Sequence, residues 1–555
     1  MDKPNSTADT VINLLKARAQ EDPSRESYVF IGRSQERLPL TRVQLWDLAG
    51  RFASRLRGYG VKVGDVVVNS LPNSRSRLVT DFGIIMSGGA TLTNEAILQD
   101  GEDFFVSIKS SNCRSLVLAS GDPTLKFLGK YVVGDYSRQE QGHEAVYPIK
   151  CDRAPCLRQA IVLRLTSHED HTAFLASLED EDFYAAPVTA QDEAYVFRTS
   201  GSTGFSKLIP RTHREILNLY IDDLQTIINK DDVIYCDRAL GWVVGYPHPY
   251  LSLGVTIYMQ EQLEVTRGVT DVWEYMVGRG MTVAMMLPED ILLVKQGYDD
   301  GRFTHTMLKN LVTFGQPIGQ VIFHLVGYMT EKVTSLYGST ETGFVSYGIV
   351  GPHNKDKVKD GYAGDRLKPG TELKVLSEVT NSPVTEPCQQ GKLFLRGGSV
   401  MRHYMNNESS TQNVFTDDGW LDTGDIAYLD EDGQLYVIAR TSESIMCGTM
   451  VLYPCWIEER FRACPGVASV YVVGIPNTTA AEDVCICVVP KKDSSLTVDD
   501  LKSYFDAMFV GGVAISDFNT GKFYITNSFP VNSTGKVARK ILRKMACEHF
   551  GIKSA

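Results

Sequence analysis

The features that would assign this 555-residue chain to a membrane or secreted class are missing from its sequence. No apolar run approaches the roughly 20 residues that a membrane-spanning helix needs. The polar segment at residues 1–6 lacks the apolar core of a signal peptide. The sequence therefore predicts no membrane span and a cytoplasmic location.

An excess of basic residues is missing too. Acidic side chains outnumber basic ones by 67 to 56, which gives a formal net charge of −11. Nucleic-acid phosphates are bound by basic surfaces, so we expect no nucleic-acid partner. Local basic patches remain compatible with a small anionic cofactor.

Cysteine spacing excludes a structural zinc site. The eleven cysteines are scattered, odd in number, and contain no pair of CxxC motifs. Free thiols in a reducing cytosol are the expected state.

What the chain does contain is an alternation of strand-like and helical segments. The apolar run at 66–68 precedes a helical pattern at 74–86, and the run at 283–287 precedes another. Such alternation is typical of parallel sheets covered by helices. The sequence therefore predicts an α/β fold, with sheets covered by helices in a large N-terminal domain.

The chain changes character near residue 440. Short strands and acidic turns over 416–440 give way to a compact α+β pattern. Its expected helices are residues 456–462 and 497–508, and its expected strands are 467–473 and 484–489. We expect two domains, residues 1–440 and a small C-terminal α+β domain at 441–555.

The strongest local signal is a β-prone segment that runs into a loop of glycines and hydroxyl residues closed by Lys207. Its members are Thr199, Ser200, Gly201, Ser202, Thr203, Gly204 and then Phe205, Ser206 and Lys207. Glycines let backbone N–H groups turn toward an anion, and hydroxyls and the lysine add donors and charge. The spacing of a Walker A motif is absent, so the segment is not a Walker A loop. Considered alone, the segment is also compatible with a flexible surface loop.

Four further motifs follow this loop, and the set of five resembles the adenylate-forming superfamily. That superfamily includes acyl- and aryl-CoA synthetases, firefly-type luciferases and peptide-synthetase adenylation domains. The five motifs lie at 199–207, 314–317, 337–341, 419–425 and 530–539. The resemblance covers about residues 15 to 545, and 208–213 is especially similar to stand-alone aryl-acid adenylating enzymes.

The resemblance implies activation of a carboxylic acid by ATP as an acyl-adenylate, followed by transfer to a thiol. It implies catalytic roles for Lys207, Glu341 and Lys536, and a Mg²⁺ site at Glu341 and Thr340. It implies ATP contacts at Thr199, Ser200, Gly201, Ser202, Thr203, Gly204, Gly315, Gln316, Pro317, Tyr337, Gly338, Ser339, Thr340, Asp425 and Arg440. Lys536 would lie on a mobile C-terminal domain that excludes water from the adenylate.

The segment that aligns with the acid pocket is apolar. Its expected lining residues are Trp242, Val243, Val244, Tyr246, Phe314, Thr342 and Gly343. Amino-acid-activating relatives have an aspartate here, and without it a buried ammonium group would be costly. The His-Asn pair of aryl-acid relatives is absent as well. We expect an aromatic or medium-chain aliphatic acid, with His248 as a packing or rim residue.

The motif after Arg440 departs from the family pattern, and this leaves the acceptor open. Ser442 replaces the usual hinge Lys or Asp, Gly448 comes one place early, and the glutamate expected after Pro454 is displaced. Coenzyme A is the expected acceptor, while a separate carrier protein and, as in luciferases, oxygen are alternatives. An inactive nucleotide-binding scaffold is the alternative from outside the enzyme class.

The phosphate-handling residues and the apolar acid segment together predict which acids the enzyme activates. ATP–pyrophosphate exchange should require Mg²⁺ and an apolar carboxylic acid, because the phosphate-handling residues are present and the ammonium partner is not. Exchange rates with benzoates and C4–C10 fatty acids, compared with free amino acids, test this expectation. A clear preference for an α-amino acid would contradict the apolar pocket.

Overall fold

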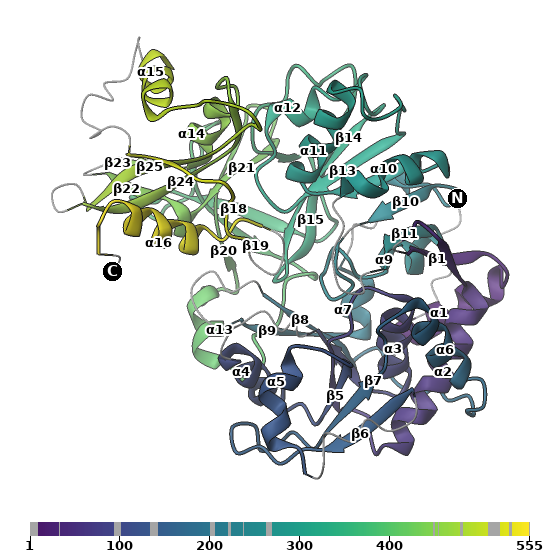
Figure 1. Ribbon diagram of the computed structural model, residues 1–555. Helices are drawn as coiled ribbons and strands as arrows, with labels where there is room; N and C mark the ends of the chain where they lie inside the picture. Colours follow the sequence, from purple (N-terminus) through teal and green to yellow (C-terminus); the bar gives the residue numbers. More distant parts are fainter. Residues whose placement is uncertain are drawn as a thin grey trace. The chain divides into compact units, whose positions relative to one another are not determined.

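The computed structural model gives the fold of most of the chain (Figure 1). It describes residues 9–32, 34–93, 101–133, 143–199, 206–219, 224–236, 238–261, 269–447, 450–452, 454–477, 481–508, 522–531 and 536–553. Within these ranges, no helix is long and apolar enough to cross a bilayer. The nine cysteines with described side chains are thiols, and all but Cys156 and the exposed Cys388 are buried.

Packing divides the chain into two compact units. The first consists of Met1–Val358, Ala363–Glu372 and Leu395–Leu421. The second consists of Lys359–Tyr362, Leu373–Phe394 and Asp422–Ala555. The second unit thus includes strands that precede Arg440. The domain boundary near residue 440 stays a prediction, because packing does not decide where two domains would move against each other.

A nine-stranded sheet belongs to the first unit, in the order β17-β15-β14-β13-β12-β10-β11-β1-β2. The strands from β14 to β1 in that order run parallel, whereas β2, β15 and β17 pair antiparallel. Their bounds are β1 (Glu26–Ile31), β2 (Arg37–Thr41), β10 (Val233–Cys236), β11 (Thr256–Gln260), β12 (Val283–Met286), β13 (Asn310–Phe314), β14 (Val333–Ser339), β15 (Gly343–Val350) and β17 (Arg366–Leu367).

A seven-stranded sheet of the same unit has the order β6-β7-β5-β3-β4-β8-β9, and its strands from β7 to β8 are parallel. The bounds are β3 (Val66–Asn69), β4 (Ala90–Leu92), β5 (Ser115–Ala119), β6 (Glu144–Pro148), β7 (Gln159–Leu163), β8 (Glu193–Arg198) and β9 (Leu208–Thr212).

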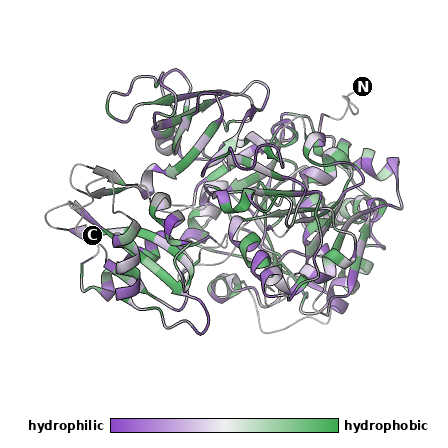
Figure 2. Cartoon of the chain, turned by 90° about the horizontal axis from the view of Figure 1, so that it is seen from above, coloured by the Kyte–Doolittle hydropathy of each residue, from purple (hydrophilic) through white to green (hydrophobic). Residues whose placement is uncertain are grey.

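The helices of this unit are mostly short. They are α1 (Val11–Glu21), α2 (Arg42–Gly58), α3 (Arg75–Met86), α4 (Glu102–Ser111), α5 (Thr124–Leu128), α6 (His168–Ser177), α7 (His213–Leu217), α8 (Leu224–Ile227), α9 (His248–Leu253), α10 (Val269–Gly278), α11 (Pro288–Asp299), α12 (Gln320–Phe323) and α13 (Glu408–Val414), with a 3₁₀ turn at Gly129–Tyr131. Many of them carry both hydrophobic and hydrophilic residues (Figure 2).

The alternation of side chains along β3 shows how the core is built. Val67 packs with residues of α2, α3 and the nine-stranded sheet in the main hydrophobic cluster, which includes Phe52 and Phe82. Val66 and Val68 point the other way and pack with α4 and α5. Helix α3 therefore lies in the main core, and every one of its residues is buried. The predicted helix at 74–86 is confirmed, with Ser74 as its N-cap.

Two further sheets lie mostly in the second unit, in the orders β16-β21-β20-β19-β18 and β23-β22-β25-β24, the latter with β26 paired to β25. The bounds are β16 (Tyr362–Gly364), β18 (Glu372–Leu376), β19 (Gly391–Arg396), β20 (Leu421–Leu429), β21 (Leu435–Arg440), β22 (Ile445–Cys447), β23 (Met450–Leu452), β24 (Val467–Asn477), β25 (Ala481–Pro490), β26 (Lys522–Ile525), α14 (Pro454–Phe461), α15 (Val498–Met508) and α16 (Arg539–His549), with a 3₁₀ turn at Thr441–Glu443.

The four elements predicted after residue 440 are confirmed as α14, β24, β25 and α15. Helix α14 begins at Pro454, two residues before the predicted start, because a proline is well accommodated in the first helical turn. The α/β fold, with a large unit of sheets and helices and a small α+β unit, is confirmed.

Candidate active site

Parallel strands determine where the polar loops of the first unit lie. The carboxyl ends of β10, β13 and β14 share one edge of the nine-stranded sheet, because these strands run in one direction. The segments that leave this edge are residues 238–248, the predicted adenine segment at 315–317, and the turn at 340–342. Residues 238–248 contain much of the predicted acid pocket and are called the acid loop. In parallel α/β sheets this edge is where ligands bind.

The stem of the predicted phosphate loop is an antiparallel pair formed by β8 and β9. Its last rung joins the Thr199 N–H to the Lys207 carbonyl at 2.9 Å, and the Lys207 N–H donates to Thr199 Oγ1 at 3.1 Å. Both residues are half-buried. The loop residues Ser200, Gly201, Ser202, Thr203 and Gly204 lie outside the described residues.

Asp103, at the start of α4, holds both arms of this stem. Its carboxylate accepts hydrogen bonds from the Ser206 N–H at 2.8 Å and the Ser206 hydroxyl at 3.1 Å, and it forms an ion pair with Arg198. Asp103 is 4% exposed. Sequence reasoning missed it, since an acidic residue in the first turn of a helix is ordinary there.

The turn between β14 and β15 carries Glu341. The Ser339 N–H donates to Thr342 Oγ1 at 2.9 Å, and Gly343 has φ +64°. A side chain on Gly338 would meet the Gly343 carbonyl at 2.0 Å. The turn is therefore tight, and it leaves Thr340 and Glu341 half-buried.

Arg211, on β9, fixes the backbone of this turn. Its Nη2 donates to the carbonyls of Thr340 at 3.1 Å and Glu341 at 2.9 Å, and its Nη1 donates to the Ser399 carbonyl at 2.9 Å. The side chain is fully buried. Burial lowers its pKa to about 10, so the guanidinium stays charged at neutral pH.

Tyr404 joins the predicted metal ligand to the predicted phosphate-loop lysine. Its hydroxyl donates to Glu341 Oε1 at 3.0 Å, and Lys207 Nζ lies 4.7 Å from the centroid of its ring. The structure thus brings Lys207 and Glu341, 134 positions apart in the sequence, to one aromatic side chain. Neither Arg211 nor Tyr404 was identified from the sequence, because their roles depend on long-range contacts.

The donor set at Glu341 fits Mg²⁺ bound largely through its substrate. Among the residues that the structure describes, no three His, Cys, Asp or Glu side chains gather as a metal cage. Tyr404 occupies only Oε1 of Glu341, which leaves Oε2 as a hard oxygen ligand. Mg²⁺ is commonly held by one or two carboxylates together with phosphates and water.

The predicted adenine segment follows β13. Gly315 has φ +90°, a left-handed conformation that favours glycine, and Gln316 and Pro317 are half-buried. Tyr337 is half-buried near the end of β14, the strand beside β13. The structure therefore brings the adenine segment and Tyr337 to adjacent strand ends.

The predicted acid-binding residues come from the acid loop, the end of β13 and the turn before β15. Trp242 and Val244 are half-buried, whereas Val243, Tyr246 and Thr342 are buried. Phe314 is 2% exposed and packs edge-on against Phe344, 6.2 Å between ring centroids. Gly343 closes the turn.

His248, expected to be a packing or rim residue, is buried with both ring nitrogens hydrogen-bonded. Its Nε2 donates to the Leu217 carbonyl at 3.2 Å, and its Nδ1 accepts from the Ser252 hydroxyl at 2.9 Å. Burial lowers the pKa of His248 to about 4. The imidazole is therefore neutral at physiological pH.

In the second unit, Asp425 and Arg440 face each other across the β20–β21 pair. Arg440 Nε lies 2.8 Å from Asp425 Oδ1, and Arg440 Nη1 donates to the Thr423 carbonyl at 2.9 Å. Asp425 is 5% exposed. The structure brings together the two residues for which the sequence predicts ribose contacts.

Lys536 is half-buried in the second unit, three residues before α16. Arg539, the first residue of α16, forms two hydrogen bonds with Glu458, at 2.6 and 3.0 Å, and donates to the Val472 carbonyl at 2.9 Å. Glu458 also accepts from the Val472 N–H at 2.7 Å. The displaced glutamate after Pro454 thus anchors the segment that carries Lys536.

Comparisons with known proteins agree with this fold. A family model described as "AMP-binding enzyme" matches residues 15–405, and one described as "AMP-binding enzyme C-terminal domain" matches 456–536. A 4-coumarate–CoA ligase of Humulus lupulus is 24% identical over 90% of this chain and 87% of its own. A peroxisomal OPC-8:0-CoA ligase of Arabidopsis thaliana is 25% identical over 91% and 88%.

Solved structures show the same architecture. An anthranilate CoA ligase in complex with anthranoyl-AMP has a TM-score of 0.79 at 17% identity, and 98% of each chain is covered. ATP-bound MatB from Rhodopseudomonas palustris has a TM-score of 0.76 at 20% identity, with 97% of this chain and 99% of the other covered. At these identities the likeness concerns the fold.

The geometry at Glu341 predicts that Arg211→Lys weakens binding of Mg²⁺–ATP. A lysine ammonium is a point donor that cannot span three carbonyls, and losing one such bond costs about 1–3 kcal/mol. We expect about a tenfold loss of affinity by isothermal titration calorimetry, with an unchanged far-UV circular dichroism spectrum. Arg402, half exposed and paired with Glu215, gives the matched control Arg402→Lys. Equal affinities of Arg211→Lys and wild type for Mg²⁺–ATP would show that the hydrogen bonds of Arg211 do not position the turn.

Proposed function

The chain belongs to the AMP-binding enzyme family, and from this premise we propose that it is an AMP-forming acid–thiol ligase. It activates a carboxylic acid with ATP, releases pyrophosphate, and transfers the acyl group from the acyl-adenylate to coenzyme A. The family match supports this proposal, together with the arrangement in which Tyr404 contacts both Lys207 and Glu341.

Coenzyme A is the proposed acceptor because curated relatives that cover most of the chain are named CoA ligases. The departures at Ser442 and Gly448 concern the segment after Arg440, and Gly448 lies outside the described residues. A separate carrier protein and oxygen are the other acceptors that the assay below distinguishes. A cytosolic location is proposed with this function.

The proposed acid is aromatic or medium-chain aliphatic. Residues 238–248 contain no carboxylate, and Trp242, Val243 and Val244 offer apolar surface. The names of two relatives, 4-coumarate–CoA ligase and OPC-8:0-CoA ligase, agree with this class of acid.

Charge neutralisation is the main task of the proposed site. Attack of the substrate carboxylate on the α-phosphorus of ATP brings two anions together, so cations must stabilise the transition state. Lys207 is proposed to bind phosphate oxygens from the phosphate loop, and Lys536 to bridge the substrate carboxylate and the α-phosphate. Glu341 and Thr340 would hold Mg²⁺, which when bound supplies positive charge to the phosphates.

Recognition of the nucleoside is proposed for two groups of residues. Tyr337 and the Gly315–Pro317 segment would contact adenine, and Asp425 and Arg440 the ribose. Asp425 already accepts from Arg440, so its carboxylate is held in one orientation before any hydroxyl binds. In the second step the thiol attacks the acyl carbon, and AMP leaves with the oxygen that bonded the acid to phosphorus.

Substitution of Lys536 should separate the two half-reactions. If the ammonium serves only adenylation, Lys536→Ala should slow acyl-adenylate formation by about 10²-fold or more, as is typical for loss of one electrostatic stabiliser. Thioester formation from synthetic acyl-adenylate and coenzyme A should stay close to the wild-type rate. Rapid-quench measurement of each step on purified protein gives both rates.

The matched control is Lys540→Ala, an exposed lysine in the first turn of α16. It should leave both half-reactions unchanged. Equal losses of both steps in Lys536→Ala would contradict the assignment of this lysine to adenylation. A wild type that forms adenylate but never transfers it to coenzyme A would instead point to a carrier protein or to oxygen.

A further inference from the structure

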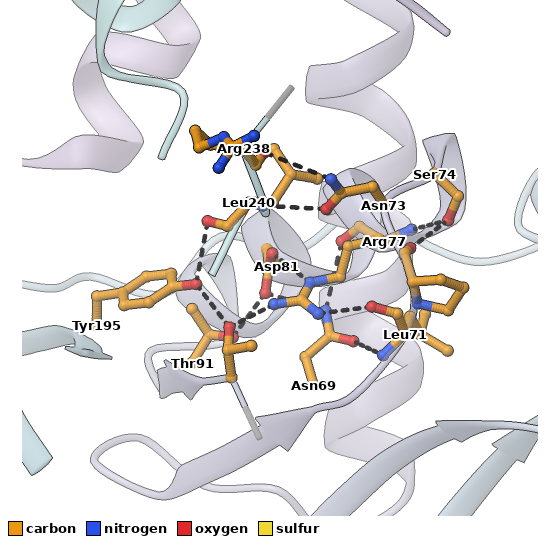
Figure 3. Close-up of polar contacts among 12 residues, drawn as sticks. Asn69, Leu71, Asn73, Ser74, Arg77, Asp81, Thr91, Tyr195, Arg238 and Leu240 are labelled. Atoms are coloured by element: carbon orange, nitrogen blue, oxygen red, sulfur yellow. Dashed lines mark hydrogen bonds and ion pairs between the residues drawn. The ribbon is translucent and has the colours of Figure 1, made fainter. Parts of the chain in front are cut away.

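A buried ion pair on α3 begins a polar network that runs to the acid loop (Figure 3). Arg77 Nε lies 2.7 Å from Asp81 Oδ2, and the two side chains are 3% and 8% exposed. The other carboxylate oxygen, Asp81 Oδ1, accepts from Asn69 Nδ2 at 3.0 Å and from Thr91 Oγ1 at 2.7 Å. The carboxylate is thus fully engaged, as a buried charge must be.

The guanidinium of Arg77 directs the rest of the network. Its Nη1 donates to the Leu71 carbonyl at 2.7 Å, and its Nη2 donates to the hydroxyl of Thr93. Because Thr93 Oγ1 accepts from the arginine, its proton is available to the Tyr195 hydroxyl, 3.0 Å away. The Tyr195 hydroxyl in turn donates to the Leu240 carbonyl at 3.4 Å. The donors therefore run in one direction, from Arg77 to the acid loop.

Asn73 holds the other side of the same loop residue. Its Oδ1 accepts from the Leu240 N–H at 3.0 Å, and its Nδ2 donates to the Arg238 carbonyl at 3.4 Å. Both backbone groups of Leu240 are thus bound by side chains that lie far away in the sequence. The acid loop cannot shift along its own direction without losing these bonds.

The network links the carboxyl edges of the two sheets in the first unit. Asn73 and Thr93 follow β3 and β4 of the seven-stranded sheet, and the acid loop follows β10 of the nine-stranded sheet. Tyr195 lies on β8, the strand that enters the phosphate loop. The link therefore spans the segments proposed to bind the acid and the phosphates.

Packing at this junction is tight around two glycines of the acid loop. A side chain on Gly241 would meet Thr93 Oγ1 at 2.1 Å, and one on Gly245 would meet the Ala239 carbonyl at 1.8 Å. The ring of Tyr246 packs edge-on against Tyr195, with centroids 5.2 Å apart. Tyr195 therefore holds the acid loop at two points, Leu240 through its hydroxyl and Tyr246 through its ring.

A buried charged pair is weak evidence for a role in stability. Taking both ions out of water is costly, and well-packed apolar side chains of similar volume often stabilise a protein as much or more. What the pair supplies is direction, because a guanidinium fixes which neighbours accept and which donate. A fixed order of donors and acceptors is what a network needs to hold the acid loop in one position.

We propose that Tyr195, Thr93 and Asn73, oriented by the Arg77–Asp81 pair, fix the acid loop against β8 and thereby determine which acids the enzyme accepts. The inference rests on the proposed function and extends it, since it assigns acid selection to residues outside the predicted pocket lining. Tyr195 and its partners are positioning residues that act through the backbone of the loop.

The decisive variants change the polar groups of the network one residue at a time. Tyr195→Phe deletes the hydroxyl and keeps the ring, Thr93→Val deletes the hydroxyl and keeps the volume, and Thr93→Ser keeps the hydroxyl. Asn73→Leu removes the acceptor of the Leu240 N–H. The matched control is Tyr298→Phe, which deletes a buried hydroxyl that accepts from Trp273 Nε1 at 2.9 Å, on the helix pair α10 and α11.

The first readout is independent of activity. Hydrogen–deuterium exchange of the peptide that covers residues 238–248 should be faster in Tyr195→Phe and Asn73→Leu than in wild type or Tyr298→Phe. Unchanged exchange in this peptide would overturn the positioning role.

The second readout is the specificity of ATP–pyrophosphate exchange with benzoate, 4-coumarate and octanoate. Loss of one hydrogen bond should raise the KM of the preferred acid about fivefold in Tyr195→Phe and Thr93→Val, and change the ratio of kcat/KM between acids. The KM for ATP should stay within about twofold, and Thr93→Ser should restore wild-type values.

The outcomes separate the two proposals. If the acid and ATP values of KM rise together, or if acid preference is unchanged while exchange of the loop is faster, the specificity role is contradicted. If the wild type catalyses ATP–pyrophosphate exchange with none of the carboxylic acids tested, the proposed function is contradicted. The hydrogen-exchange comparison then still confirms or contradicts the positioning of the loop.

Discussion

Parallel pairing of strands is the constraint on which the arrangement of the first unit depends. Strands that run side by side in one direction release their loops at one edge, whatever the distance between those loops in the sequence. The segments after β10, β13 and β14 meet there in the nine-stranded sheet, and those after β3, β4 and β8 meet at the corresponding edge of the seven-stranded sheet. Every predicted site residue of this unit that the structure describes lies in or beside one of these segments.

Arginine side chains then hold the segments that carry predicted site residues. Arg211 binds the backbone of the Glu341 turn, Arg77 orients the donors that hold the acid loop, and Arg539 ties the segment after Lys536 to Glu458. In each case a planar guanidinium contacts several acceptors at once, which a lysine ammonium cannot do with the same geometry. The residues proposed to act on substrate thus lie on segments that these arginines hold through hydrogen bonds.

The sequence predicted the helices and strands that depend on local residue patterns. The apolar run at 66–68 and the helical pattern at 74–86 became β3 and α3, because strand alternation and helix capping are properties of short segments. The motif from Thr199 to Lys207 was legible for the same reason. Its assigned roles, and the domain boundary near residue 440, stay predictions.

Long-range contacts could not be obtained in this way. In the sequence, nothing distinguishes Asp103 from other acidic residues in the first turn of a helix, or Arg211 from other polar residues of a strand. Nothing near Tyr404 in the sequence indicates that its hydroxyl meets Glu341 or that its ring meets Lys207. Such contacts depend on how separate strands and loops pack, which one sequence does not specify residue by residue.

The proposed reaction requires that the carboxylate of the acid bonds to the α-phosphorus of ATP. Transfer of oxygen from a carboxylate labelled with ¹⁸O tests it most directly, with benzoate, ATP, Mg²⁺, coenzyme A and purified protein. Each AMP should acquire one labelled oxygen, because the thiol attacks the acyl carbon and the bridging oxygen leaves with the phosphate. Thioester formation with unlabelled AMP, or label in inorganic phosphate, would contradict an acyl-adenylate.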